Sequence, residues 1–102
     1  MENFKSYYAV IFTSTQNDDI AGYSEMAEKM ETLAKQQKGF LGIESAKNKV
    51  GITVSYWENL EVIKKWKQQS EHVVAQLKGR HDWYTWYHVR ICKVESEYEF
   101  NR

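Results

Sequence analysis

Hydrophobic and polar positions follow two different periods along this chain of 102 residues. Residues 7–13 form a continuous run of apolar and strand-forming side chains, which is typical of a strand covered on both faces. Apolar residues then recur at spacings of three and four until Lys38 and Gly39 end the run, as in an amphipathic helix. Caps for its start are offered by Asn17, Asp18 and Asp19. The apolar positions of this predicted helix are Ile20, Tyr23, Ala27, Met30, Leu33 and Ala34.

The middle of the chain predicts a β-hairpin followed by a second helix. Residues 40–46 and 51–57 are rich in strand-forming side chains, and the polar segment 47–49 between them predicts a turn. Asn59 can cap the second helix, which is predicted to end near Gly79. The apolar positions that share one face of this helix are Ile63, Trp66, Val73 and Leu77.

The last quarter of the chain contains the longest predicted strand. Residues 85–100 lack Gly and Pro and repeat β-branched and aromatic side chains, so they predict a strand of roughly 50 Å. Large apolar residues stand at consecutive positions here and in residues 7–13, so both faces of the sheet require burial. We therefore predict a homodimer in which a second copy covers the open face. The alternative is a monomer with an exposed aromatic face.

The predicted order of elements is β-α-β-β-α-β, which is the ferredoxin-like unit of the α+β class. In this unit a four-stranded antiparallel sheet carries both helices on one face. We expect residues 1–102 to form a single domain, since one core suffices at this size. Two such subunits packed sheet to sheet would form a dimeric α+β barrel.

Composition removes several classes of function. Lys and Arg together number 14, as do Asp and Glu, so the chain lacks the basic excess that favours nucleic acid. No segment has the roughly 18 consecutive apolar residues of a membrane span. The start of the chain does not resemble a signal peptide, and the single Cys92 cannot form an internal disulfide, so we expect a cytoplasmic protein. Aromatic residues make up 15%, which suits a filled core or a pocket for a flat ligand.

Several short segments together resemble the antibiotic biosynthesis monooxygenase family. They are residues 40–42 at the start of one predicted strand, residues 56–59 at the end of the next, and Trp66 followed by His72. The resemblance covers the chain from Tyr7 to Tyr98. It implies small dimeric α+β barrels, which include cofactor-free quinone-forming oxygenases and a haem-degrading branch.

The two branches differ in the residues that the resemblance implies for them. The haem-degrading branch implies an Asn in the first strand, a helical Trp, and a His ten residues after that Trp. Trp66 matches, but residues 7–15 contain no Asn and Gln76 stands ten residues after Trp66. His72 lies about 120° away around a regular helix. The resemblance therefore favours oxygenation of a small aromatic or quinol-like molecule without a cofactor.

Such an oxygenase must bind an electron-rich aromatic, remove a proton from it, and exclude water. We expect a pocket between helices and sheet, in which Trp66 forms a wall and Tyr23 and Tyr56 orient a phenolic substrate. His72 is the candidate base, because imidazole titrates near neutral pH. Each residue also has a structural interpretation: Trp66 as core packing and His72 as a solvated helix residue. The alternative function is a non-catalytic protein that binds a small hydrophobic ligand or haem.

Metal binding is not predicted. His88 and Cys92 form one close pair and His81 precedes them, but structural zinc sites combine two close pairs. The chain therefore lacks the spacing of a typical zinc site.

Overall fold

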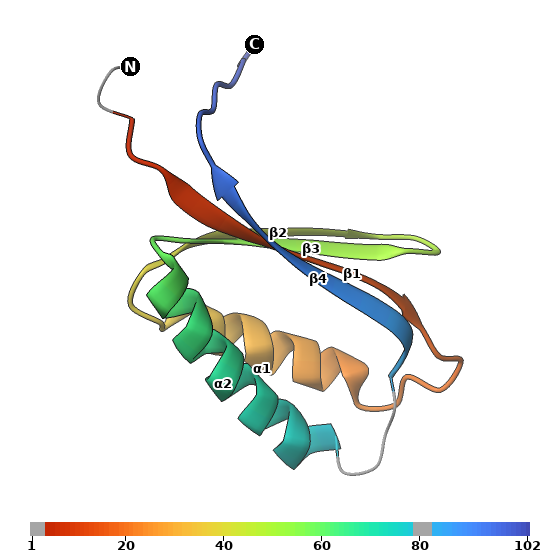
Figure 1. Cartoon of the computed structure of the whole chain (residues 1–102). Helices are drawn as coiled ribbons and strands as arrows, with labels where there is room; N and C mark the ends of the chain where they lie inside the picture. Colours follow the sequence, from red (N-terminus) through yellow and green to blue (C-terminus); the bar gives the residue numbers. More distant parts are fainter. Residues whose placement is uncertain (1–3, 79–82) are drawn as a thin grey trace.

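The computed structural model describes residues 4–78 and 83–102, with residues 75–78 described by their backbone alone, and it confirms the predicted order of elements (Figure 1). The elements are β1 (Tyr7–Gln16), α1 (Tyr23–Lys35), β2 (Phe40–Lys47), β3 (Gly51–Trp57), α2 (Leu60–Lys78) and β4 (Tyr84–Val94). The predicted helix end at Gly79 and the predicted packing of Leu77 lie outside this description.

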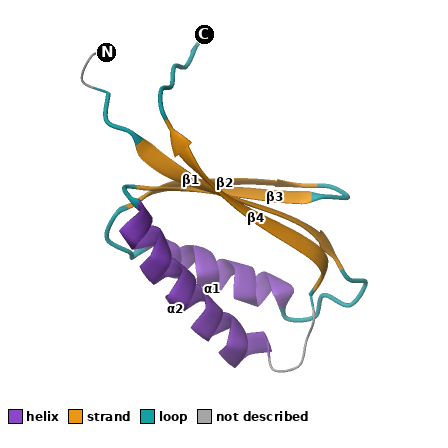
Figure 2. Ribbon diagram, viewed as in Figure 1, coloured by secondary structure: helices purple, strands orange, loops and turns teal. Residues whose placement is uncertain are grey.

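The four strands form one sheet in the order β2-β3-β1-β4, and each neighbouring pair is antiparallel. Both helices lie on the same side of this sheet (Figure 2). These features confirm the ferredoxin-like α+β fold. They also leave the other side of the sheet uncovered within one subunit.

The strand register assigns each side chain to one of two faces, because residues opposite each other in an antiparallel ladder share a face. Tyr8 pairs with Trp57 and Lys93, whereas Ala9 pairs with Tyr56 and Cys92. We call the side that carries the helices the helix face: Tyr8, Val10, Phe12, Ser14, Ser55, Trp57, Tyr87, Val89 and Ile91. The other side is the open face: Tyr7, Ala9, Ile11, Thr13, Ile52, Val54, Tyr56, Trp86, His88, Arg90 and Cys92.

The two helices begin in different ways. Helix α1 starts at Tyr23, later than predicted, because Asp19 caps a turn instead: its Oδ1 accepts a hydrogen bond from Ala21 N at 3.1 Å. Gly22 then precedes the helix with a φ of 82°. Helix α2 has the predicted cap, since Asn59 Oδ1 accepts a hydrogen bond from Val62 N at 2.9 Å. Within the described residues, neither helix has the length and apolar character needed to cross a membrane.

The core lies where α2 crosses β3. Trp57 is 0% exposed, and its ring stacks on Trp66 at 5.6 Å and meets Phe40 edge-on at 5.4 Å. Its indole Nε1 donates a hydrogen bond to Ser55 Oγ at 2.8 Å, so the buried donor is satisfied. We call this group the tryptophan core: Ala34, Phe40, Ser55, Trp57, Ile63 and Trp66.

Gly39 brings the end of α1 against α2. Its φ of 91° is disfavoured for residues with a Cβ, and a Cβ at this position would lie 2.8 Å from a methyl group of Val62. Glycine is therefore required here both by the backbone and by the close approach of the second helix.

Strand β4 is shorter than predicted, because it ends at Val94 rather than near residue 100. Val94 pairs with Tyr7, the first residue of β1, so none of the strands described in this subunit lies beside residues 95–102. Figure 1 shows this C-terminal arm running past the edge of the sheet, and Tyr98 within it is 97% exposed. The strand prediction was wrong here because an extended sequence needs a partner to form a ladder.

Candidate functional site

Trp66 lies in α2 and faces the sheet, as predicted. Its ring is half-buried and stacks on Trp57 with an interplanar angle of 26°. The contact makes Trp66 part of the tryptophan core, which is the structural interpretation of this residue.

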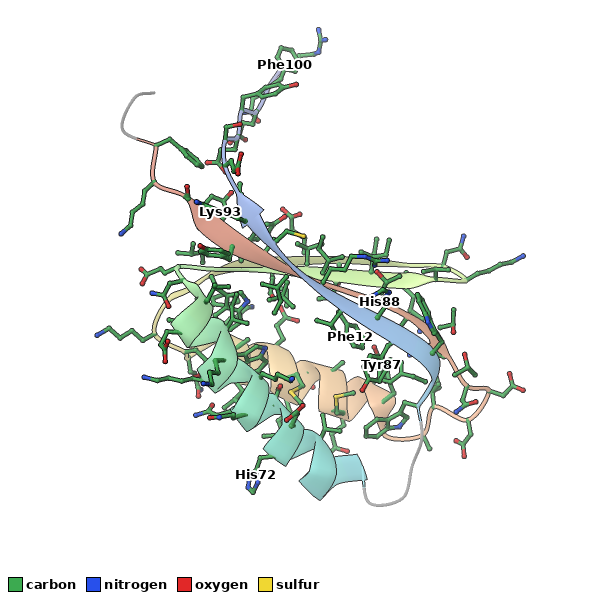
Figure 3. All side chains as sticks on the ribbon, in the orientation of Figure 1. Phe12, His72, Tyr87, His88, Lys93 and Phe100 are labelled. Carbon is green, nitrogen blue, oxygen red and sulfur yellow. The ribbon has the colours of Figure 1, made fainter. Side chains whose placement is uncertain are left out.

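His72 also lies in α2, but its side chain is exposed. Figure 3 shows it on the outer side of the helix, directed away from the sheet. A general base has to come within hydrogen-bond reach of the proton that it removes. The structure therefore does not bring His72 to the space between helices and sheet.

Tyr56 lies on the open face of the sheet. Its ring meets Tyr7 at 5.9 Å, and its hydroxyl donates a hydrogen bond to Glu44 Oε1 at 3.3 Å. Burial and the neighbouring Glu44 carboxylate raise the pKa of Tyr56. Because Trp57 faces the helices, the alternation of a strand turns Tyr56 to the other side, so it does not join Trp66 or Tyr23.

Tyr23, the first residue of α1, joins a group of rings at the opposite end of the helix face from the tryptophan core. Its ring meets that of Tyr84 at 5.9 Å. Tyr84 meets Phe12 at 5.4 Å and Tyr87 at 5.8 Å, and Phe12 stacks on Tyr87 at 5.4 Å. We call these four residues the tyrosine cluster. Figure 3 shows Phe12 and Tyr87 on the helix side of β4.

A β-bulge places Tyr84 in this cluster. Thr15 pairs with Trp86 and Gln16 pairs with Tyr84, which leaves Thr85 as an extra residue in β4. Thr85 Oγ1 lies 2.5 Å from Thr15 Oγ1 and fixes the bulge to β1. In a regular strand Tyr84 would share the open face with Trp86, but the extra residue turns it to the helix face.

Trp83 joins the segment before α1 to the start of β4. The side chain is buried, and its Nε1 donates a hydrogen bond to the carbonyl oxygen of Ala21 at 2.8 Å. Its own carbonyl oxygen accepts a hydrogen bond from Asn17 N at 2.9 Å. The ring also meets Tyr23 edge-on at 6.3 Å. Trp83 thus holds the segment before α1 against the start of β4, beside the tyrosine cluster.

The polar groups of this cluster supply hydrogen-bond donors. Burial, followed by hydrogen bonding and the charge of Tyr23, raises the pKa of Tyr84, so its phenol is neutral at physiological pH. Gln16 Nε2 is buried and has no hydrogen-bond partner among the residues that the structure describes. Lys47 Nζ lies 5.5 Å from the centre of the Tyr23 ring. Tyr87 is 59% exposed, so the cluster is open to solvent on the side of β4.

Sequence reasoning identified one member of this site, Tyr23, and missed the others. Phe12, Tyr84 and Gln16 lie in or beside predicted strands, where they carry no signal that separates them from packing residues. Their proximity follows from the register of β1 and β4 and from the bulge at Thr85.

The donor set of the described residues does not fit a metal ion or a haem. No group of three His, Cys, Asp or Glu side chains gathers within residues 4–78 and 83–102. His88 lies on the open face and His72 on the outer side of α2, so neither can ligate iron beside the tyrosine cluster. His81, the third histidine of the metal hypothesis, lies outside the described residues.

Comparison with known proteins identifies a relative at the sequence level. The uncharacterized protein YqjZ of Bacillus subtilis (strain 168) is 47% identical over 93 residues, which is 89% of this chain and 82% of the relative. No family model matches the sequence.

Solved structures with low sequence identity share the fold. A variant of SnoaB from Streptomyces nogalater, a cofactor-independent oxygenase, has a TM-score of 0.72 at 8% identity and covers 92% of this chain and 97% of its own. A variant of MhuD, with two manganese protoporphyrin IX molecules per active site, has a TM-score of 0.68 at 14% identity and covers 91% and 99%. Both structures share the fold of this chain.

Proposed function

Because the chain belongs to the family of the Bacillus subtilis protein YqjZ and has the antibiotic biosynthesis monooxygenase fold, we propose that it is a cofactor-independent monooxygenase of a small aromatic or quinol-like substrate. The tyrosine cluster is the observation that carries this proposal. It combines aromatic rings with phenol groups at one solvent-accessible end of the helix face, and the amide of Gln16, which has no described partner, lies beside it.

The proposed reaction draws its electrons from the substrate itself. Loss of a proton to water, from a phenol group or from a ring carbon conjugated with a carbonyl group, gives an anion, which passes an electron to O₂. Recombination forms a carbon–oxygen bond to a hydroperoxide, and loss of water leaves a new carbonyl group. One oxygen atom of O₂ enters the product and the other leaves as water, so neither metal nor flavin is required.

The described residues suggest separate roles in this reaction. The rings of Phe12 and Tyr87 offer a surface against which a flat substrate can stack. Tyr23 and Tyr84 present hydroxyl groups to it. Trp66 acts at a distance, by holding α2 against β3 through Trp57. His72 and Tyr56 are given no role in the proposed site, because they point away from it.

Oxygen uptake tests the proposal. The purified protein is mixed with hydroquinones and with anthrone, and O₂ consumption is followed with an electrode. We expect turnover by the wild type and a loss of about tenfold or more in Tyr84→Phe, which keeps the ring but removes the hydroxyl group. Tyr98→Phe, a change in the exposed arm, is the matched control and is expected to retain full activity. Absence of uptake with every substrate in the wild type would contradict an oxygenase function.

Ligand binding without catalysis is the alternative function, and it requires a separate binding experiment. A haemin titration monitored at the Soret band separates porphyrin binding from binding of smaller aromatics. The positions of His72 and His88 argue against a histidine-ligated haem in the described part of the chain. We therefore expect no Soret shift that indicates histidine ligation.

We also propose that the functional unit is a homodimer in which a second copy covers the open face. Trp86, on this face, is 48% exposed, and β4 leaves large apolar residues exposed on its other face as well. The C-terminal arm extends beyond its own sheet, and none of the four described strands pairs with it. A second sheet packed against the open face would bury this surface and offer the arm a neighbour.

A charge introduced into the open face tests this dimer. Cys92 is exposed in one subunit and lies on the open face, opposite Ala9 in the edge strand β4, so Cys92→Asp leaves the subunit fold intact but buries a carboxylate on association. We expect light scattering to report a dimer for the wild type and a monomer for Cys92→Asp. Thr32→Asp, on the exposed side of α1, is the control and should remain dimeric. A monomeric wild type at micromolar concentration would overturn the proposal.

A further inference from the structure

We infer that Arg90 and Glu44 determine how a second copy of this chain docks on the open face: Arg90 of each subunit pairs with Glu44 of the partner subunit, so that β4 lies opposite the partner's β2. The inference rests on the proposed homodimer. It adds the orientation of the two subunits and the residues that select this orientation.

Arg90 and Glu44 stand in one row across the open face. Glu44 in β2 pairs with Val54 in β3. Ile11 in β1 pairs with Val54 on one side and with Arg90 on the other. Directly paired residues share a face, so all four belong to the open face. Because β2 and β4 are the two edges of the sheet, the backbones that carry the two charges lie three strand spacings apart, about 14 Å.

Both charges require a partner once this face is covered. Arg90 has no ion-pair partner among residues 4–78 and 83–102. Glu44 Oε1 accepts a hydrogen bond from the hydroxyl of Tyr56 at 3.3 Å, which leaves Oε2 to accept from a guanidinium. A second sheet would take both groups out of water, and a buried charge needs a group of opposite sign. A second copy supplies one such group for each.

Charge distinguishes two orientations of the second copy. A two-fold axis between packed sheets can run along the strands or across them. An axis along the strands exchanges the edges, so Arg90 meets Glu44 of the partner subunit at both ends of the row. An axis across the strands keeps each edge opposite itself and brings Arg90 towards Arg90 of the partner subunit. Because like charges repel and opposite charges attract, charge selects the axis along the strands.

The sizes of the side chains select the same axis independently. On the open face, β4 carries Trp86, His88 and Arg90, whereas β2 carries Gly42 and Ala46. An axis along the strands places the large side chains of one edge over the small side chains of the other. An axis across the strands opposes large to large at one edge and leaves space at the other. Interfaces are packed as densely as protein interiors, so the first arrangement is favoured.

Charge reversal tests the pairing through the dissociation constant of the dimer, measured by analytical ultracentrifugation. Arg90→Glu places two carboxylates opposite each other at both ends of the row, so we expect this constant to rise about 100-fold or more. Glu44→Arg should have a similar effect. Both side chains are exposed in the subunit, so circular dichroism should show an unchanged fold in each variant.

The double variant, Arg90→Glu with Glu44→Arg, distinguishes the two orientations. With the axis along the strands it restores opposite charges at both contacts, so we expect a dissociation constant within about tenfold of the wild type. With the axis across the strands, both contacts would still join like charges. A double variant that dissociates as readily as the single variants would therefore overturn the inferred orientation.

Lys93→Glu is the matched control. Lys93 is exposed in the same edge strand, but it pairs with Tyr8 and belongs to the helix face. The substitution makes the same change of charge as Arg90→Glu, and we expect the dissociation constant of the wild type. Dimers that survive both single reversals would overturn the pairing but retain the homodimer, whereas a monomeric wild type would overturn both. Neither result depends on oxygen uptake.

Discussion

The tryptophan core and the tyrosine cluster occupy opposite ends of the same helix face, and both are built from aromatic rings at 5–6 Å. In the tryptophan core, Trp57 is fully buried and its one polar atom is paired with Ser55. In the tyrosine cluster, Tyr87 is exposed and the amide of Gln16 has no described partner. Aromatic content is therefore a poor guide to function, whereas unpaired polar atoms beside aromatic rings distinguish a candidate binding site from a packed core.

The largest effect on stability is expected in the tryptophan core. Trp57→Ala removes the central ring from a fully buried position, and we expect it to lower the free energy of unfolding by about 3–5 kcal/mol. Urea denaturation followed by circular dichroism measures this change. Tyr87→Ala is the matched ring deletion in the tyrosine cluster. The contrast between the two regions would be wrong if Trp57→Ala lost less unfolding free energy than Tyr87→Ala.

A substitution at Gly39 measures how much its backbone conformation and its contact with Val62 contribute to stability near the tryptophan core. Gly39→Ala combines a positive φ with a methyl group 2.8 Å from Val62, so we expect a loss of about 1–3 kcal/mol from backbone strain, together with a steric contribution. Gly22→Ala shares the positive φ, but its Cβ would lie 3.7 Å from Trp83. The difference in thermal stability between the two variants reports the steric contribution, and equal losses would show that the contact with Val62 is unimportant.

In the tyrosine cluster, we expect Tyr84→Phe to weaken ligand binding much more than it lowers stability. The ring and its contacts remain, so we expect a loss of only about 1 kcal/mol in unfolding free energy. Affinity for anthrone, measured by fluorescence titration under anaerobic conditions, should fall severalfold. A large loss of stability with unchanged affinity would assign Tyr84 to the core instead.

Alkaline pH offers a direct measure of the buried phenol. Because the pKa of Tyr84 is raised on folding, its contribution to stability is present below pH 10, the usual tyrosine pKa, and declines as the pH rises above it. We expect unfolding at pH 11 to require less urea than at pH 9. The difference should shrink in Tyr84→Phe, and an undiminished difference would exclude Tyr84 as its source.

The smallest effect concerns the base of the C-terminal arm. Tyr7 donates a hydrogen bond to Glu97, which raises the pKa of Tyr7 to about 12. Glu97→Gln should return this value towards 10 with little change in unfolding free energy, since the contact is exposed. Ultraviolet titration of tyrosine ionisation, with Tyr7→Phe for assignment, measures the shift. A pKa that stays near 12 would mean that another group holds the proton.

The sequence was sufficient to predict the elements and their order. The continuous apolar run of residues 7–13 and the strand-forming side chains of residues 51–57 predicted strands, and the Asn59 cap predicted the start of α2. The position of Trp66 on the inner side of α2 also followed from its spacing. These features depend on neighbours within a few residues, so local pattern and capping chemistry determine them.

Features that depend on distant partners were not predictable. Tyr56 and Trp57 are both aromatic, so the sequence does not show which of them faces the helices. The predicted site placed Tyr56 on the helix face, whereas the structure places it on the open face. The end of β4 is set by where β1 begins, at Tyr7. Residues 95–100 have strand-forming side chains, but no strand in the described part of the subunit pairs with them.

Because Thr85 is an extra residue in β4, the side of the sheet on which Tyr84 lies depends on the number of residues in this segment as well as on their identity. A homologue that is one residue shorter between Trp83 and Trp86 would conserve every aromatic side chain and still present the Tyr84 hydroxyl on the opposite side of the sheet. Length at this point is therefore a marker for sorting relatives into those that retain the chemistry and those that retain the architecture alone.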